Sequence, residues 1–473
     1  MTETSYPIEP TDAELAGKLR ESVHAALPSS IADLSSLVKI PSVSWDSFDP
    51  ENVVASSQAV AALVESTGLF DSVKTSRAPI EGDVLGHPAV LATRAARNGR
   101  PTVLLYAHHD VQPEGRAELW ETPPFEPTVR GDRLYGRGAS DDKAGVMTHV
   151  AALRAVHEVL GDDLNVGVVV FIEGEEEFGS RSFTNFLAQH RDELAADLII
   201  VADADNPSTT VPGLTVGLRG NVTFKLTVST LSHASHSGMN GGAVPDGMLA
   251  MIKLLATLHD DEGSVAVAGL TSREGDYPDY PESQLREETG LLEGVSPIGT
   301  GHILSRLWSK PSITVTGIDA PSVLNASNTL SPEVSVKISA RVAPGQTAAA
   351  AFDALEAHLR AHAPFGAHVE IDDVDRGNAF LVDTSGWGVA EGLQALEEGW
   401  GAAPLQVGAG GSIPFIADLA EVFPEAQILV TGVEDPDTRA HSPNESQHLG
   451  VFHRSILSEA LLLARLDGRT IED

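Results

Sequence analysis

Short apolar runs alternate with amphipathic stretches along the first part of the chain. The runs are TVLLYA (102–107), VGVVVFI (166–172) and LIIVA (198–202), and apolar residues recur at helical spacing in 144–160 and 182–190. A short continuous apolar run is typical of a strand buried on both faces, and strands that alternate with helices favour a parallel sheet. The pattern predicts an α/β fold with a mostly parallel, mixed sheet flanked by helices.

The pattern changes near residue 218. Segments 221–229 and 334–342 alternate apolar with polar residues, which is typical of antiparallel strands with one solvent-exposed face. The earlier pattern returns towards the C-terminus. We therefore expect an inserted α+β domain that divides a catalytic domain into two parts, with bounds of 1–217 and 375–473 for the catalytic domain and 218–374 for the insertion.

The N-terminal segment predicts a helix from Asp12 to about Leu37, with a break near Pro28. The residues before it have neither the basic start nor the apolar stretch of a secretory signal. No window approaches the roughly 18 uncharged apolar residues that a membrane span needs. We expect a soluble cytoplasmic protein with no membrane partner.

Composition narrows the chemistry of the chain. With Lys+Arg 31 against Asp+Glu 67, the formal net charge of −36 disfavours nucleic acid and anionic membranes as partners. There are no cysteines, so disulfides, thiolate nucleophiles and Cys-ligated zinc are excluded. Any metal must be held by His, Asp or Glu.

Ligand-type side chains gather where the predicted strands end. Because ligands of parallel α/β sheets bind beyond the carboxyl ends of the strands, these residues are expected at one edge. Five segments contribute: His108, His109 and Asp110; Asp141 and Asp142; Glu175, Glu176 and Glu177; Asp203 and Asp205; and His441.

Each segment alone has an ordinary explanation as a loop histidine, a helix N-cap or a solvated acidic run. Together they would bury several carboxylates, which costs many kcal/mol without cations. A ligand set of imidazole and carboxylate groups without sulfur is suited to zinc, cobalt or manganese. A bridging carboxylate and two further ligands for each ion would leave room for a shared water between ions about 3.5 Å apart, and a spare carboxylate could act as its general base.

The motifs HHDVQP, GRGASDDKAG, EGEEEFGS, VAD, SHSGMNGG and AHSPNE occur in this order over most of the chain. In this respect the sequence resembles the aminoacylase, acetylornithine deacetylase, succinyl-diaminopimelate desuccinylase and carnosinase family of dinuclear metallopeptidases, and is most similar to the carnosinase-type dipeptidases. The resemblance implies a zinc-peptidase-like catalytic domain interrupted by a ferredoxin-like lid domain that forms a homodimer.

Roles for individual residues follow from the resemblance. Asp110 would orient His108, and Glu176 would be the general base for the water between the ions. The expected ligands of the two ions, with Asp141 bridging both, are His108, Asp141, Glu177, Asp203 and His441.

Neighbouring residues compete for three of these roles. His109 could replace His108, although only His108 has the H-x-D spacing. Glu175 is the spare carboxylate of its triplet, and Asp205 competes with Asp203. Ala144 stands where many relatives have glycine, and we expect this change to matter little.

The lid would supply the substrate contacts. His236 resembles the histidine that reaches the partner subunit's site and polarises the scissile carbonyl, while His233 is a nearby alternative. Arg341 resembles the arginine that grips the substrate carboxylate with its bidentate fork. Gly411 and Ser412 resemble part of the catalytic-domain loop that meets the same substrate carboxylate, and Asn328 is a candidate for contacting the tetrahedral oxygens.

The resemblance implies hydrolysis of the amide bond of dipeptides or short peptides, with two divalent ions per subunit, Zn²⁺ first and Mn²⁺ or Co²⁺ as alternatives. An N-acyl amino acid deacylase, acting on acetyl or succinyl substrates, is the nearest rival because it would use the same metals. A non-catalytic protein that binds metal or peptide is a further alternative, although binding alone needs no spare base beside a complete ligand set.

Overall fold

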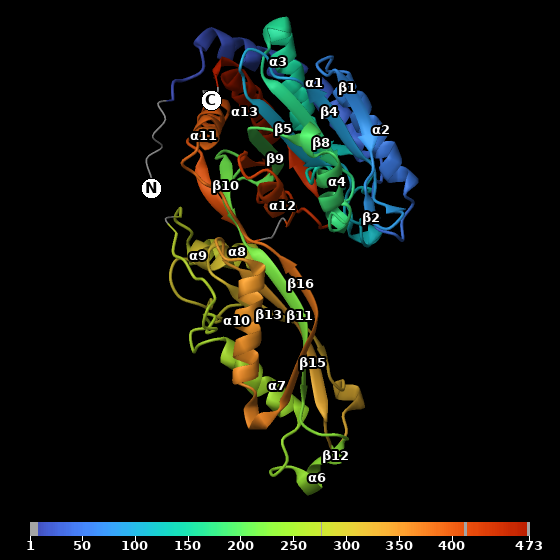
Figure 1. Cartoon of the computed structure of the whole chain (residues 1–473), viewed down its shortest axis with the longest axis vertical. Helices are drawn as coiled ribbons and strands as arrows, with labels where there is room; N and C mark the ends of the chain where they lie inside the picture. The colour runs from blue at the N-terminus through green and yellow to red at the C-terminus, as the bar shows by residue number, and fades with distance from the viewer. Residues whose placement is uncertain (1–7, 276, 411–413, 471–473) are drawn as a thin grey trace. The chain divides into compact units, whose positions relative to one another are not determined.

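The computed structural model describes residues 8–275, 277–410 and 414–470. The chain forms two compact units (Figure 1). The first contains Met1–Val216, Val382–Val407 and Asp418–Asp473, and the second contains Gly217–Leu381 and Gly408–Ala417. The boundary expected from the sequence, after residue 374, falls inside strand β16 (His368–Gly377), and the second unit continues to Leu381.

A mixed sheet forms the centre of the first unit. Its strands, in spatial order, are β1 (Ser72–Ser76), β4 (Ala89–Arg94), β8 (Gly167–Glu173), β5 (Thr102–His108), β9 (Leu198–Asp205), β19 (Gln427–Glu434) and β10 (Gly213–Leu218). The central strands β8, β5, β9 and β19 are parallel. The flanking strands β1, β4 and β10 pair antiparallel, and β10 also pairs with β17 (Phe380–Leu381) and β18 (Leu405–Ala409).

Both faces of this sheet are covered. Val103 and Leu105 of β5 belong to a buried core that also contains residues of α1, α3 and α13. On the opposite face, the ring of Tyr106 lies 5.5 Å from Phe171 and 6.2 Å from Phe183, measured between ring centroids. Burial on both faces explains why the central strands are continuous apolar runs.

Helix α3 lies in the middle of one helical layer, where it packs against α1 and α13 (Figure 1). Helix α11 packs against α13 in the same layer. The helices of this part of the chain are α1 (Ala13–Val38), α2 (Glu51–Glu65), α3 (Lys143–Leu160), α4 (Phe183–Gln189), α5 (Arg191–Leu194), α11 (Trp387–Trp400), α12 (Pro414–Val422) and α13 (Leu449–Gly468).

Helix α1 corrects one expectation from the sequence. It continues through Pro28 without a break. The hydroxyls of Ser29 and Ser30 donate to the carbonyl oxygen of Ala26, two residues before the proline, at 2.7 and 3.2 Å. Packing of α1 against α3 and α13 outweighs the local cost of the proline.

The second unit contains a four-stranded antiparallel sheet in the order β13 (Ser312–Asp319), β15 (Glu333–Val342), β11 (Gly220–Ser229) and β16 (His368–Gly377). Helix α7 (Gly247–Leu255) lies between β11 and β13 in the chain, and α10 (Ala348–Ala361) lies between β15 and β16. This is the β-α-β-β-α-β connectivity of ferredoxin-like domains. Alternate residues of β11, such as Val222 and Phe224, are buried in its core.

The other strands and helices are short. They are β2 (Pro79–Glu81), β3 (Val84–Leu85), β6 (Thr128–Arg130), β7 (Arg133–Tyr135), β12 (Ser235–His236), β14 (Thr329–Leu330), β20 (Ser446–His448), α6 (Ser237–Asn240), α8 (Glu282–Thr289) and α9 (Ile303–Trp308). Among the described residues, no helix combines the length and apolar character that crossing a membrane requires.

Candidate metal centre

His108 is the last residue of β5 and is fully buried. Its Nδ1 lies 3.1 Å from the carbonyl oxygen of Asp110, and its Nε2 lies 3.1 Å from Oδ1 of Asp141. Nε2 nevertheless makes no hydrogen bond of good geometry with any described group. A buried imidazole nitrogen that faces a carboxylate without bonding to it fits a metal ligand.

Asp110 contacts both the His108 region and the acidic segment that follows β8. Its carboxylate accepts the Ser44 hydroxyl at 2.7 Å and the backbone N–H groups of Glu176 and Glu177 at 3.1 Å each. Burial opposes ionisation, but the neighbouring His108 outweighs it, so the pKa of Asp110 lies below its usual value. One carboxylate therefore positions both His108 and the start of the acidic segment after β8.

Two groups of three candidate ligands share Asp141. In each group one ligand atom from every residue lies within 4.8 Å of the others; the groups are His108, Asp141 and Asp203, and Asp141, Glu177 and His441. His441 Nε2 lies 2.9 Å from Asp141 Oδ2 and 3.2 Å from Glu177 Oε2. The structure thus brings together all five residues that the sequence proposes as ligands.

Glu176 lies beside these groups and belongs to neither. Its Oε2 is 3.8 Å from His108 Nε2, and 19% of the side chain is exposed. Burial raises the pKa of Glu176 well above its usual range, and the nearby carboxylates of Asp203 and Glu177 raise it further. Glu176 is therefore a carboxyl close to both groups with room to contact solvent or substrate.

The electrostatics of the cluster favour bound cations. Burial and neighbouring carboxylates raise the pKa of Asp203 well above its usual range and that of Glu177 to about 7. Hydrogen bonds to Asp141 and Glu177 raise the pKa of His441 to about 11. Protons thus compensate the clustered charge where no ion does, and divalent cations would replace them. The donor set of imidazole and carboxylate fits such ions.

The neighbouring residues that compete for these roles in the sequence belong to neither ligand group in the structure. The His109 ring is buried with Nε2 2.9 Å from the Pro88 carbonyl oxygen, and burial lowers its pKa to about 4. Glu175 accepts the backbone N–H groups of His87 and Ser182 at 3.1 and 2.6 Å. Neither these two residues nor Asp205 belongs to a ligand group.

The residues that the sequence assigns to substrate contacts in a lid domain, His236 and Asn328, lie in the second unit. His236 is exposed at the end of β12, and its Nδ1 accepts the Gly238 N–H at 3.1 Å. The N–H of Ser237 donates to the carbonyl oxygen of the exposed Asn328 at 2.9 Å, so His236 and Asn328 are neighbours. His233 is also exposed.

Arg341 lies on β15 opposite Asn221 of β11 and Ser312 of β13. It therefore projects on the face of this sheet that is opposite to the buried core. Gly411 and Ser412 lie outside the described residues.

Two residues of the quoted motifs were given no role from the sequence. Gln112, in HHDVQP, donates its backbone N–H and side-chain Nε2 to the two carboxylate oxygens of Glu177 at 3.1 and 2.7 Å. Glu445, in AHSPNE, is fully buried beside the Asp141 segment. The motifs included both positions, but a hydrogen bond to a residue of a distant segment leaves no pattern in the sequence.

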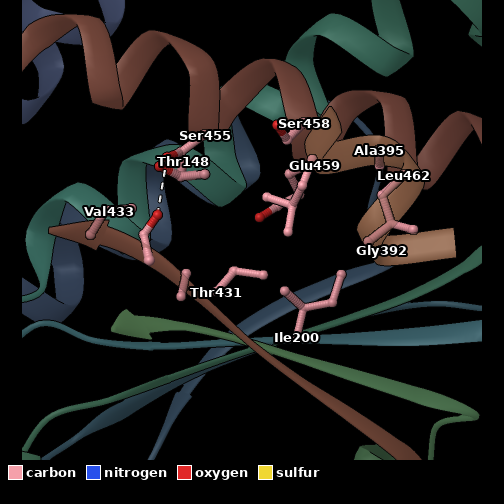
Figure 2. Close-up of a pocket in the computed structure, with 13 residues that line it drawn as sticks. Thr148, Ile200, Gly392, Ala395, Thr431, Val433, Ser455, Ser458, Glu459 and Leu462 are labelled. Atoms are coloured by element: carbon pink, nitrogen blue, oxygen red, sulfur yellow. Dashed lines mark hydrogen bonds between the residues drawn. The ribbon is translucent and has the colours of Figure 1, made fainter. Parts of the chain in front are cut away.

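A separate cavity of about 20 Å³ lies between the sheet and helices α3, α11 and α13 (Figure 2). Thr148, Ile200, Ser458 and Glu459 are among its lining residues, and none of the candidate ligands lines it. A single water needs about 10–15 Å³, so this cavity is too small for a substrate.

An α/β sheet with adjoining histidine and carboxylate groups at its carboxyl edge is the arrangement of a metal-dependent hydrolase. The model of peptidase family M20/M25/M40 matches residues 104–464. The chain therefore belongs to this family and is a metallopeptidase, which confirms the resemblance seen in the motifs.

Curated relatives of the chain include dipeptidases. It is 35% identical over 392 residues to the cysteinylglycine-S-conjugate dipeptidase of Corynebacterium striatum, which covers 80% of this chain and 86% of that protein. It is 28% identical over 391 residues to the human Beta-Ala-His dipeptidase, covering 76% of this chain and 73% of that protein.

Solved structures have the same fold. The di-peptidase Dug1p from Saccharomyces cerevisiae aligns with a TM-score of 0.75 at 22% identity, over 96% of this chain and 99% of that one. Human carnosine dipeptidase 1 also aligns with a TM-score of 0.75 at 22% identity, over 98% and 100% of the two chains.

Proposed function

We propose that this metallopeptidase is a dipeptidase that hydrolyses the amide bond of dipeptides or short peptides with two divalent ions, of which Zn²⁺ is the first choice. The observation that carries the proposal is the pair of ligand groups that share Asp141, with Glu176 beside them and in neither group. The relatives named as dipeptidases for Cys-Gly conjugates and Beta-Ala-His support the choice of a small peptide as substrate.

The proposed ligand assignment follows the two groups. His108, Asp141 and Asp203 would hold one ion, and Asp141, Glu177 and His441 the other. Such ions, when bound, polarise a carbonyl and lower the pKa of a coordinated water.

The chain's own contribution to the chemistry is proton transfer and positioning. The Glu176 carboxylate would accept a proton from the attacking water and deliver it to the leaving amine nitrogen. Its pKa is raised in the ion-free cluster, and cations nearby would lower it towards the value of a base that works near neutral pH. Asp110 would keep Glu176 in place through the backbone N–H of that residue, which it accepts at 3.1 Å.

We assign substrate recognition to the second unit acting as a lid. His236 and Asn328, which are neighbours there, would stabilise negative charge on the carbonyl oxygen. Arg341, together with Gly411 and Ser412, would bind the free carboxylate of the substrate, a role that suits a bidentate guanidinium.

A homodimer through the second unit is part of the proposal. Strand β13 is at the edge of its sheet, and Val315 and Ile318 on it are 42% and 54% exposed. Val323 and Leu324 follow with 96% and 92% exposure. An edge strand with exposed apolar residues is a surface that pairing with a second copy would cover.

The decisive experiment combines metal analysis with a substrate screen. The purified protein is stripped with a chelator and reconstituted with Zn²⁺, Mn²⁺ or Co²⁺, and bound ions per chain are measured beside hydrolysis rates. Cys-Gly, β-Ala-His and further dipeptides are compared with N-acetyl and N-succinyl amino acids. We expect two ions per chain and hydrolysis of dipeptides. Activity on the N-acyl substrates alone would identify a deacylase, and folded protein with a single loosely held ion would refute the proposed site.

A further inference from the structure

Glu445 directly precedes strand β20 (Ser446–His448) and has no exposed side-chain surface. Its Oε1 accepts the backbone N–H groups of Ser140 and Asp141, each at 3.1 Å. Its Oε2 accepts the N–H of Gly138 at 3.1 Å and Nη1 of Arg137 at 2.6 Å. Every one of these groups donates to the carboxylate, so one side chain holds residues 137, 138, 140 and 141.

The backbone that Glu445 holds leads directly to the shared ligand. The N–H of Asp141 is one of its donors, and the side chain of the same residue approaches His108 through Oδ1 and His441 through Oδ2, at 3.1 and 2.9 Å. A shift of this backbone would move the shared carboxylate relative to both ligand groups at once.

Glu445 also follows His441 by four positions in the chain, so one segment carries both a candidate ligand and the anchor for another. His441 and Asn444 have positive φ values of 59° and 64°, a region that non-glycine residues rarely adopt. The Asn444 side chain bonds to the backbone of residues 119 and 121 at 3.0 and 2.8 Å. The contacts of Asn444 and Glu445, which both follow His441 in the chain, therefore hold this segment beside residues 119–121 and 137–141.

Further contacts join the two segments without involving the side chain of Glu445. The Ser140 hydroxyl donates to Oε1 of Gln447 at 2.7 Å, and the N–H of Gly136 donates to the carbonyl oxygen of Glu445 at 3.0 Å. The segments would thus stay adjacent if the carboxylate were changed, and the particular contribution of the Glu445 side chain is the placement of the 138–141 backbone.

We propose that Glu445 is a positioning residue that fixes the Asp141 backbone before any ion binds, so that Asp141 is presented as a ligand to both ions. The proposal rests on the assignment of Asp141 as the shared ligand under the proposed function. Replacing a group that orients a metal ligand through hydrogen bonds typically weakens metal affinity by about 10–100-fold.

The first test uses Glu445→Gln, which keeps the size of the side chain and removes its charge. The matched control is Glu391→Gln, because Glu391 is a largely buried carboxylate of the same unit, with 12% of its side chain exposed, and pairs with Arg465 at 2.6 Å. Zn²⁺ affinity and ions per chain are measured by competition with a chromophoric chelator, with circular dichroism to establish folding. We expect at least tenfold weaker zinc binding for folded Glu445→Gln and wild-type affinity for Glu391→Gln. Wild-type affinity in folded Glu445→Gln would overturn the proposal.

The second test needs no variant, so it decides the question even where Glu445→Gln fails to fold. Hydrogen exchange of the peptide spanning 138–142 is followed in metal-free wild-type protein and after addition of Zn²⁺. We expect strong protection of the Ser140 and Asp141 amides already in the metal-free state. Protection that arises only with zinc would refute positioning by Glu445. Both readouts are independent of the substrate, so a failure here is distinguishable from a failure of the dipeptidase proposal.

Discussion

Replacement of Glu176 by Gln tests the proposed chemistry most directly. Glu176 is in neither ligand group, and its backbone N–H is held by Asp110 at 3.1 Å, a contact that the substitution leaves intact. The amide has nearly the same volume as the carboxyl but cannot accept a proton from water. The substitution therefore removes the base while it keeps the geometry of the ligands.

The expected size of the effect follows from the role of the residue. A positioned general base contributes about 10²–10⁴-fold, and Glu176 would act twice, on the attacking water and on the leaving amine. We expect kcat to fall by about 10³–10⁴, which corresponds to roughly 4–5.5 kcal/mol at about 1.4 kcal/mol for each factor of ten. KM should change little, because Glu176 is not assigned to substrate binding.

Metal binding is expected to weaken only modestly. Glu176 Oε2 lies 3.8 Å from His108 Nε2, so its charge contributes to the local attraction for cations, but every assigned ligand remains. Loss of the charge also removes the cost of holding a buried carboxylate among others. The assay is therefore run at saturating Zn²⁺, with ions per chain measured on the same samples and Glu391→Gln as the control for loss of a carboxylate elsewhere.

The pH dependence adds a second readout. In the wild type, kcat/KM should rise with pH as the base ionises, and the residual activity of Glu176→Gln should lack that limb. A folded Glu176→Gln protein that carries two ions and turns over dipeptides within tenfold of the wild-type rate would show that another group is the base.

Three further predictions concern stability, packing and the lid. The pKa of Glu177 is raised from 4.5 to about 7. Its contribution to the stability of the metal-free protein is therefore present below about pH 4.5 and is lost as the pH rises towards 7, by on the order of 3 kcal/mol. Thermal unfolding with and without Zn²⁺ should show this decline only without the metal. Gly145→Ala would place a Cβ 2.1 Å from a buried carboxylate oxygen, so its melting temperature should fall by several degrees. The control is Gly17→Ala, whose Cβ meets nothing within 4 Å, and its melting temperature should stay the same or rise. If His236 acts across a dimer, mixing inactive His236→Ala and Glu176→Ala chains should restore activity, and no recovery after confirmed subunit exchange would remove that role.

The sequence predicted the central strands well because they are buried on both faces and contain continuous apolar runs. It did not predict β1 (Ser72–Ser76), which is the edge strand of the sheet and has the residues SVKTS with mostly exposed side chains. A short edge strand buries too little to need an apolar pattern. The strand is recognisable only from its pairing with β4, which is a contact between distant residues.

At the site, the sequence predicted which segments would meet but could not by itself select between adjacent residues. Consecutive residues of a strand point to opposite faces, so His108 faces the ligand groups while His109 contacts the Pro88 carbonyl oxygen. The H-x-D spacing of the family motif selected His108. Glu445 had no such signal, because its function is expressed through backbone N–H groups 304 to 307 residues away in the chain.

The three glutamates that follow strand β8 show why residue type alone does not define a site. Glu175 is saturated by backbone N–H groups of His87 and Ser182, so its charge is compensated within the protein. Glu177 accepts hydrogen bonds from the backbone N–H and the side-chain Nε2 of Gln112, and it also belongs to a candidate ligand group. Glu176 accepts no described hydrogen bond that would compensate its charge and lies among other carboxyls. A buried carboxylate that already has its donors needs no cation, whereas one that faces only other carboxylates and imidazoles needs a cation or a proton. Under the proposed function, the same triplet therefore supplies a structural anchor, a base and a ligand, and the donors around each residue decide which role it takes.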